Sequence, residues 1–291
     1  MNSIFRRLFV RRPCRLLVCS AIGASVVLCV STGGAAGPAG NALGRQGADR
    51  GAVPRIRTDT ANQIDSIPTG TVLPVLLPSI SSKKLKEGDK ITARVAQDVP
   101  LGSGAKIRRG AKVIGTVVSN ETPGAGNGAK LTIRFASVVQ DDKPIPTRTS
   151  LRALASSLEV DDAQIPTTGP GESDVYDWLP TRQIGGDVVY GKGGPVARGS
   201  QVLGESTYQG VFVKLAENPE GQCRGPIGGN DRPQAVWLFS ADACGLYGFA
   251  NLQIRHAGRT EPTGEIELES KKGPVQIRSG GGALLRVVGG A

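Results

Sequence analysis

The sequence predicts a mainly β protein: two small antiparallel β-domains, barrel-like or sandwich-like, that follow a signal peptide and a flexible tether. The 291-residue chain has 41 glycines and 19 prolines but only 4% aromatic residues, which suits short strands joined by tight turns. Ile91, Ala93 and Val95 alternate with polar residues, the two-residue period of a strand with one buried face. Gly-rich turn segments such as residues 123–128 separate the apolar runs.

The first 36 residues have the three parts of a signal peptide for export. A basic stretch ends at Arg15, an apolar run covers residues 16–30, and small residues follow it. The alternative is a retained membrane anchor, but the run has about fifteen residues, whereas a membrane-spanning helix needs about 20. We therefore expect cleavage near residue 36 and no transmembrane helix in the mature chain. Residues 37–63 are polar and Gly-rich, which predicts a disordered tether.

The formal net charge of +10 is concentrated at the amino terminus. Five basic residues and no acidic residue precede the apolar run: Arg6, Arg7, Arg11, Arg12 and Arg15. Without them the chain keeps 30 basic and 25 acidic residues, a surplus of +5. Because this surplus is small and no basic stripe alternates with aromatic residues, the sequence does not predict nucleic-acid binding.

The cysteines agree with export. Three of the five lie within residues 1–36, so cleavage leaves only Cys223 and Cys244. In an oxidising compartment such a pair is predicted to form a disulfide. The bond would close a loop of about twenty residues and stabilise the fold by about 3 kcal/mol. A reactive thiol and half of a metal site are the alternatives.

Two groups of short apolar runs predict the two β-domains, at residues 64–150 and 196–291. In the first group the expected strands cover residues 71–77, 90–99, 112–119 and 131–139. In the second group they cover residues 211–215, 235–240, 252–256, 265–269, 275–278 and 284–288. Residues 151–195 are predicted to form a connector.

The best helix candidate lies where the connector begins. Leu151, Leu154 and Leu158 share one face behind Ser150, a residue type that caps helices. We therefore expect a short helix over residues 150–158.

Three segments carry a family resemblance: Ile-Pro-Thr-Gly-Thr-Val-Leu-Pro at 67–74, the run at 91–99, and Ile-Arg-Arg-Gly-Ala-Lys-Val-Ile-Gly at 107–115. Together they resemble the C-terminal β-domain of the TrbI-like envelope-channel component of type IV secretion systems. The resemblance covers residues 64–150 and implies their fold and a setting in the cell envelope. Arg108 replaces the family's proline, and the similarity does not extend to the family's pore-forming parts. The rest of the chain resembles exported bacterial proteins of unassigned function.

Pro68 and Pro74 predict the position of the first strand in its sheet. Proline has no backbone N–H to donate, so a strand bracketed by two prolines is expected at a sheet edge. An exposed edge can pair with another chain. A homo-oligomer formed through strand edges is therefore one predicted assembly.

Three patterns contain residue types that carry chemistry, but each is incomplete. Residues 186–193 resemble a phosphate-binding loop but end in glycine, where Ser or Thr must hold the metal ion. Ser81 and Lys84 have the Ser-x-x-Lys spacing of penicillin-binding enzymes without the accompanying motifs. Cys244 and His256 have the side-chain types of a nucleophile pair or a zinc site, without enough further ligands. We predict no catalytic residue, metal or cofactor.

The aromatic residues suggest a different kind of site. Trp178, Tyr190 and Trp237, with Tyr208 and Tyr247, would give a stacking surface for glycans. The alternative is that these rings fill the core.

The function that the sequence favours is that of an exported, non-enzymatic structural or interaction protein of the cell envelope, associated with assembly or secretion. Its location would be periplasmic or extracellular, and its partner an envelope protein or cell-wall glycan. One alternative is a module that binds peptidoglycan or another glycan. The other is a secreted hydrolase that uses Ser81 and Lys84 or Cys244 and His256.

Overall fold

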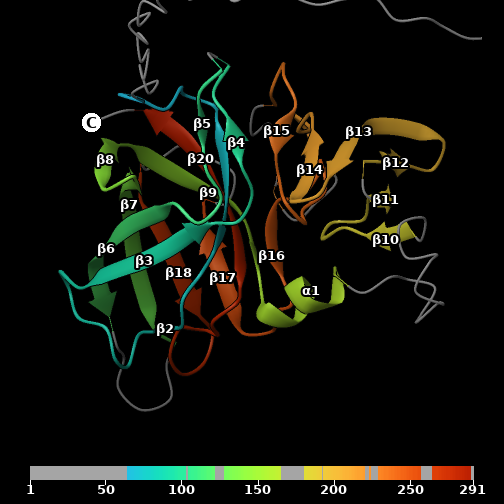
Figure 1. Ribbon diagram of the computed structural model, residues 1–291. Helices are drawn as coiled ribbons and strands as arrows, with labels where there is room; N and C mark the ends of the chain where they lie inside the picture. Colours follow the sequence, from blue (N-terminus) through green and yellow to red (C-terminus); the bar gives the residue numbers. More distant parts are fainter. Residues whose placement is uncertain are drawn as a thin grey trace, which may run out of the picture. The chain divides into compact units, whose positions relative to one another are not determined.

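Figure 1 shows the computed structural model, which describes residues 64–102, 104–121, 128–164, 180–191, 193–219, 223, 229–256 and 264–289. The predicted signal peptide, the tether and Trp178 lie outside these ranges. All the described residues belong to one unit of internal contacts, Thr58–Ala291. Most of its regular structure is β-strand, which confirms the predicted fold class.

A ten-stranded, nearly closed, barrel-like sheet forms the larger part of the fold. Its strands follow the order β16-β9-β20-β1-β3-β6-β7-β18-β17, and β8 pairs with β7. The strands are β1 (Val72–Leu76), β3 (Lys90–Val95), β6 (Lys112–Glu121), β7 (Lys130–Gln140), β8 (Lys143–Pro146), β9 (Arg148–Ala155), β16 (Gly245–Tyr247), β17 (Leu252–Arg255), β18 (Ile266–Ser270) and β20 (Gly282–Gly289). Neighbours are antiparallel except β16 and β9. The two end strands, β16 and β17, contact each other, which nearly closes the sheet.

Alternating apolar side chains fill the interior of this sheet. In β3 the side chains of Ile91, Ala93 and Val95 are buried and those between them are exposed. Leu131 and Ile133 are buried in the same alternating way in β7. An apolar cavity among these strands has a volume of only about 20 Å³, close to the space that one water molecule needs. The interior is therefore a packed core.

A six-stranded antiparallel sheet lies beside the large sheet and is yellow to orange in Figure 1. Its strands, in chain order, are β10 (Pro180–Arg182), β11 (Val188–Tyr190), β12 (Pro195–Arg198), β13 (Gln201–Thr207), β14 (Gly210–Val213) and β15 (Gln234–Ala235). A second apolar cluster joins the sheets, because Val196, Val213 and Phe239 pack with Ala153 of β9 and Leu284 of β20. Two short pairs complete the strands: β2 (Ile80–Ser81) with β19 (Gln276–Ile277), and β4 (Val99–Pro100) with β5 (Lys106–Ile107).

Gln97 adds a polar link between the two sheets. It follows β3 and is fully buried. Its Nε2 donates to the carbonyl oxygen of Val211 at 3.2 Å, and its Oε1 accepts from the backbone N–H of Trp237 at 2.7 Å. A Cβ atom at Gly210 would lie 2.6 Å from that Oε1, so glycine is required where the two sheets approach.

The two segments predicted as separate β-domains share the large sheet. Every residue of β1 pairs with β20, from Val72 opposite Arg286 to Leu76 opposite Gly282. β18 pairs with the first part of β7, and β17 pairs with β18. The division predicted at residues 151–195 therefore does not separate two sheets. Period-two patterning predicts that a strand has a buried face, but it does not identify the partner strand.

The predicted helix over residues 150–158 is wrong for most of its length. Residues 148–155 form β9, and α1 (Ser157–Asp162) begins after Ser156, whose Oγ accepts from the Glu159 backbone N–H at 3.3 Å. Every residue of β9 except the first is buried, because β9 lies between β20 and β16. Tertiary pairing thus overrides the local helical pattern. Within the described ranges, no helix has the length and apolar character that crossing a bilayer requires.

β1 is not the edge strand that Pro68 and Pro74 predicted. It pairs with β20 on one side and with β3 on the other. The Pro74 carbonyl oxygen accepts from the Ala96 N–H at 2.8 Å on the β3 side. The N–H and C=O groups of one strand residue point to the same side, so the N–H that Pro74 lacks would face β3. That position lies beyond the last residue pair of β1 and β3, Val75 opposite Val95. A homo-oligomer through this strand has no free edge to use.

The shared sheet predicts that the first predicted domain does not fold alone. A chain that ends at residue 195 lacks β18 and β20, so it exposes the apolar core and leaves β1 and β7 each unpaired on one side. We expect such a chain to show no cooperative urea unfolding by circular dichroism, whereas the full chain shows a cooperative transition. A cooperative transition in the shortened chain would contradict the shared core.

Candidate functional site

Residues 241–244, Ala-Asp-Ala-Cys, form a loop segment that side chains from both sheets bind. The segment follows β15 and leads into β16. Its two alanines are small, which leaves space for long side chains to reach its backbone. These side chains are Arg152 from the large sheet and Asp187 beside the six-stranded sheet.

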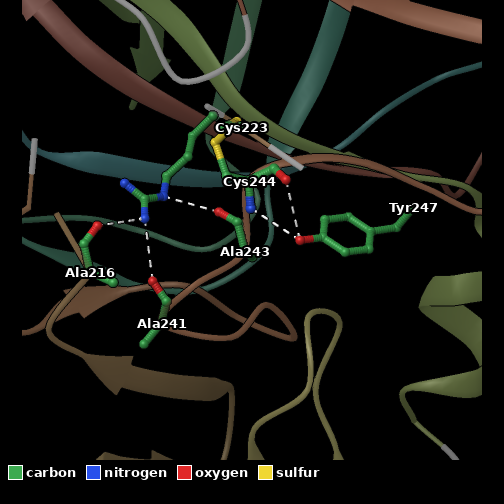
Figure 2. Close-up of a disulfide and its surroundings, with 7 residues drawn as sticks. Ala216, Cys223, Ala241, Ala243, Cys244 and Tyr247 are labelled. Carbon is green, nitrogen blue, oxygen red and sulfur yellow. Dashed lines mark hydrogen bonds between the residues drawn. A yellow bond between two sulfur atoms is a disulfide. The ribbon is translucent and has the colours of Figure 1, made fainter. Parts of the chain in front are cut away.

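Arg152 lies in β9 and is 1% exposed. Its Nε donates to the carbonyl oxygen of Ala243 at 3.0 Å, and its Nη2 donates to those of Ala216 at 3.0 Å and Ala241 at 3.3 Å (Figure 2). Burial lowers the pKa of Arg152 to about 10, and the charge of Arg286 acts in the same direction. The guanidinium is therefore still charged at neutral pH. The carbonyl oxygens offset its loss of hydration.

The predicted disulfide between Cys223 and Cys244 is present, with the two Cα atoms 5.5 Å apart. Figure 2 shows the Tyr247 hydroxyl directed at the backbone of Cys244. The Tyr247 hydroxyl accepts from the Cys244 backbone N–H at 3.1 Å and donates to the Cys244 carbonyl oxygen at 3.4 Å. Burial raises the pKa of Tyr247, which keeps the hydroxyl protonated and able to donate. Cys244 is thus held through both its sulfur and its backbone.

Asp187 holds the segment from the other side, in a charged cluster with Arg198 and Asp242. The Asp187 side chain is fully buried. Its Oδ1 accepts from Arg198 Nε at 3.0 Å and Nη2 at 2.8 Å, and its Oδ2 accepts from the Ala241 N–H at 2.7 Å. Arg198 also pairs with the carboxylate of Asp242. Arg198, at the end of β12, therefore pairs with two buried carboxylates.

This arrangement anchors the backbone of residues 241–244. The polar groups of Arg152 and Asp187 are themselves used as hydrogen-bond donors and acceptors in it. The donors of Arg152 bind carbonyl oxygens, and the Asp187 oxygens accept from a guanidinium and an amide. Such a network positions a loop rigidly when its members are satisfied. In the part of the chain that the structure describes, no group of three or more His, Cys, Asp or Glu side chains could hold a metal ion.

The residues of the hydrolase hypotheses are placed as follows. The sulfur of Cys244 is bonded to Cys223, so it has no thiolate to act as a nucleophile. His256 is exposed and follows β17 with a φ of 61°. Ser81 ends β2, and its carbonyl oxygen accepts from the Lys84 N–H at 3.0 Å, so this pair forms part of a turn.

The phosphate-loop pattern at residues 186–193 begins in the turn between β10 and β11 and contains β11. The Gln183 N–H donates to the Asp187 carbonyl oxygen at 2.8 Å, and β11 follows directly. A phosphate loop leads into a helix, whereas this segment leads into the next strand, β12. The lysine of the pattern, Lys192, lies outside the described residues.

Of the predicted glycan-binding residues, Tyr190 and Trp237 lie in different parts of the six-stranded sheet region. Trp178 lies outside the described ranges. Tyr190 is 43% exposed at the end of β11, whereas Trp237 follows β15 and packs against the second apolar cluster. Four strand spacings separate β11 from β15. Neighbouring strands lie about 4.8 Å apart, so the two strands are roughly 19 Å apart across the sheet. Trp237 is thus partly buried against the core, as the alternative interpretation expects for this residue.

Four charged residues of this site were not predicted from the sequence: Arg152, Asp187, Arg198 and Asp242. Arg152 is the one that carried a signal, because it is a single charge within a run of small and apolar residues, 151–155. A charge in a buried strand needs a partner, but the helical interpretation placed it on a solvent-facing side. The carboxylates had no such signal, because Asp187 lies among glycines that predict an exposed turn.

Comparisons with models of known protein families, with curated proteins and with solved structures found no match.

The buried guanidinium predicts a specific loss of stability. Arg152→Met keeps the apolar stem but removes the buried cation from three carbonyl oxygens, of which that of Ala241 still accepts from the Ala216 N–H. We expect the free energy of unfolding to fall by about 3 kcal/mol. Arg148→Met is the matched control, because Arg148 is exposed in the same strand and should cost less than about 0.5 kcal/mol. Urea unfolding measures both values. Similar small losses for the two variants would contradict an anchoring role.

Proposed function

We propose that this chain is an exported, non-enzymatic structural or interaction protein of the cell envelope. The observation that carries the proposal is the Cys223–Cys244 disulfide. Both cysteines are buried, at 9% and 0% exposure, and the other three cysteines precede residue 37. A buried structural disulfide suits a protein that folds in an oxidising compartment, periplasmic or extracellular.

The packing of the described residues supports a role through surfaces. Apolar side chains fill the interior of the large sheet, and the charged side chains around residues 241–244 bind backbone. A rigid protein of this kind offers its outer turns to a partner. The resemblance of residues 64–150 to the TrbI-like family supports an envelope partner, and assembly or secretion is the setting that we propose.

Export predicts a change of thiol state with location. In a bacterial host, the full chain should appear in the osmotic-shock fraction, with Cys223 and Cys244 protected from alkylation until a reductant is added. A chain that starts at residue 37, behind an added methionine, should stay in the cytosol with both thiols alkylated. The readout is mass spectrometry of the alkylated peptides in each fraction. A cytosolic full chain with two free thiols would contradict the proposal.

A cross-linking experiment tests the partner. Intact cells that make the full chain are treated with a short cross-linker, and the complexes are identified by mass spectrometry. An envelope protein linked to an outer turn supports an interaction role. Unlinked, freely diffusing monomer in the shock fluid contradicts it.

A further inference from the structure

Exposed lysines gather on two turns of the large sheet. One turn joins β2 to β3 and the other joins β18 to β19. Together with the first residue of β3, they carry six exposed lysines: Lys83, Lys84, Lys86, Lys90, Lys271 and Lys272. The acidic residues on the same turns are Glu87 and Asp89. This group is called the lysine end below.

Hydrogen bonds hold the two turns side by side. β2 pairs with β19, with Ile80 opposite Ile277. Beyond that pair, the Ser82 N–H donates to the Val275 carbonyl oxygen at 3.0 Å, and the Val275 N–H donates to Ser82 Oγ at 3.0 Å. The label of β2 marks this end at the bottom of the large sheet in Figure 1. The lysines therefore form one surface, although nearly 200 residues separate the two turns in the sequence.

The lysine end holds most of the positive surplus of the described residues. Its six lysines face two acids, whereas the other described residues have 17 basic and 16 acidic side chains. Within the described ranges none of the six ammonium groups forms an ion pair. Asp89 accepts from the backbone N–H of Lys86 at 2.7 Å, so its carboxylate binds the turn itself. The six lysines and two acids leave a net charge of +4 concentrated at this end.

The types of residue at the lysine end indicate its partner. Every basic group there is a lysine, a point charge that attracts anions without the two-pronged geometry with which arginine reads one phosphate. Neither turn has an aromatic side chain on which a base could stack, as single-stranded nucleic acids require. Leu85, the apolar residue between the lysines, packs on the core. These features suit adsorption to a broad anionic surface without insertion into it.

We propose that the lysine end docks the large sheet on the anionic headgroups of a phospholipid bilayer. Each lysine near such a surface contributes to binding, and the contributions sum over the patch. The inference goes beyond the proposed envelope role because it rests on the charge distribution of the folded chain and needs no export. The contact is electrostatic and reversible.

The test is vesicle co-sedimentation of the full chain. Vesicles of phosphatidylcholine are compared with vesicles that also contain phosphatidylglycerol, and the readout is the ratio of the two partition coefficients. Residues 1–30, with their five arginines and apolar run, are the same in all forms. Any contribution they make to lipid binding therefore cancels in comparisons between variants. We expect the wild-type chain to prefer the anionic vesicles. The preference should vanish near 1 M salt, where the Debye length is about 3 Å.

Two triple variants with the same net charge locate the contact. Lys83→Gln, Lys84→Gln and Lys271→Gln together should lower the preference at least about tenfold. The control combines Lys112→Gln, Lys143→Gln and Lys214→Gln, which replace exposed lysines elsewhere, and it should keep the wild-type preference. Circular dichroism shows that both variants fold.

Three results would overturn the proposal. The first is a wild-type chain that does not distinguish the two lipids at low salt. The second is an equal loss in both triple variants, which would show that overall charge is responsible. The third is that single-stranded DNA binds at the lysine end while anionic vesicles do not, which would assign the surface to a nucleic acid.

Discussion

The buried guanidinium of Arg152 is the interaction on which the joining of the two sheets depends. It extends from a strand of the large sheet and binds carbonyl oxygens of Ala241 and Ala243, in the loop that follows the six-stranded sheet. A buried cation is stable only while its acceptors stay in place, because removal of a partner leaves an uncompensated charge. The loop therefore cannot leave the large sheet without a large cost in free energy, and it holds the smaller sheet beside it.

The other contacts continue this link into the six-stranded sheet. Asp187 binds the Ala241 amide and Arg198, so the loop is fixed to that sheet as well as to Arg152. The disulfide ties Cys223 to the end of the same segment. Apolar packing around Phe239 excludes water between the sheets, which strengthens each polar contact there. A rigid body of this kind suits a protein that acts through its outer turns.

The sequence predicted the features that depend on local pattern. The alternation in β3 and β7 identified strands and their buried faces, and cysteine counting identified the disulfide. It did not predict which strands pair, because the two-residue period is the same whatever the partner strand. The pairing of β1 with β20 was therefore not predicted. The segment of β9 was predicted to be a helix, because the spacing of Leu151 and Leu154 is compatible with a helix and with a buried strand. Only the neighbouring strands decide between the two. The lysine end was missed for a similar reason, since its two turns meet only in the fold.

Coupling between Arg152 and the disulfide tests the central claim most directly. A double-mutant cycle would combine Arg152→Met with replacement of both Cys223 and Cys244 by alanine, and urea unfolding would give the four free energies. If both restraints act on residues 241–244, the second change costs less once the first has released the loop. The account predicts a coupling energy of at least about 1 kcal/mol. Additive effects, within about 0.5 kcal/mol, would contradict it.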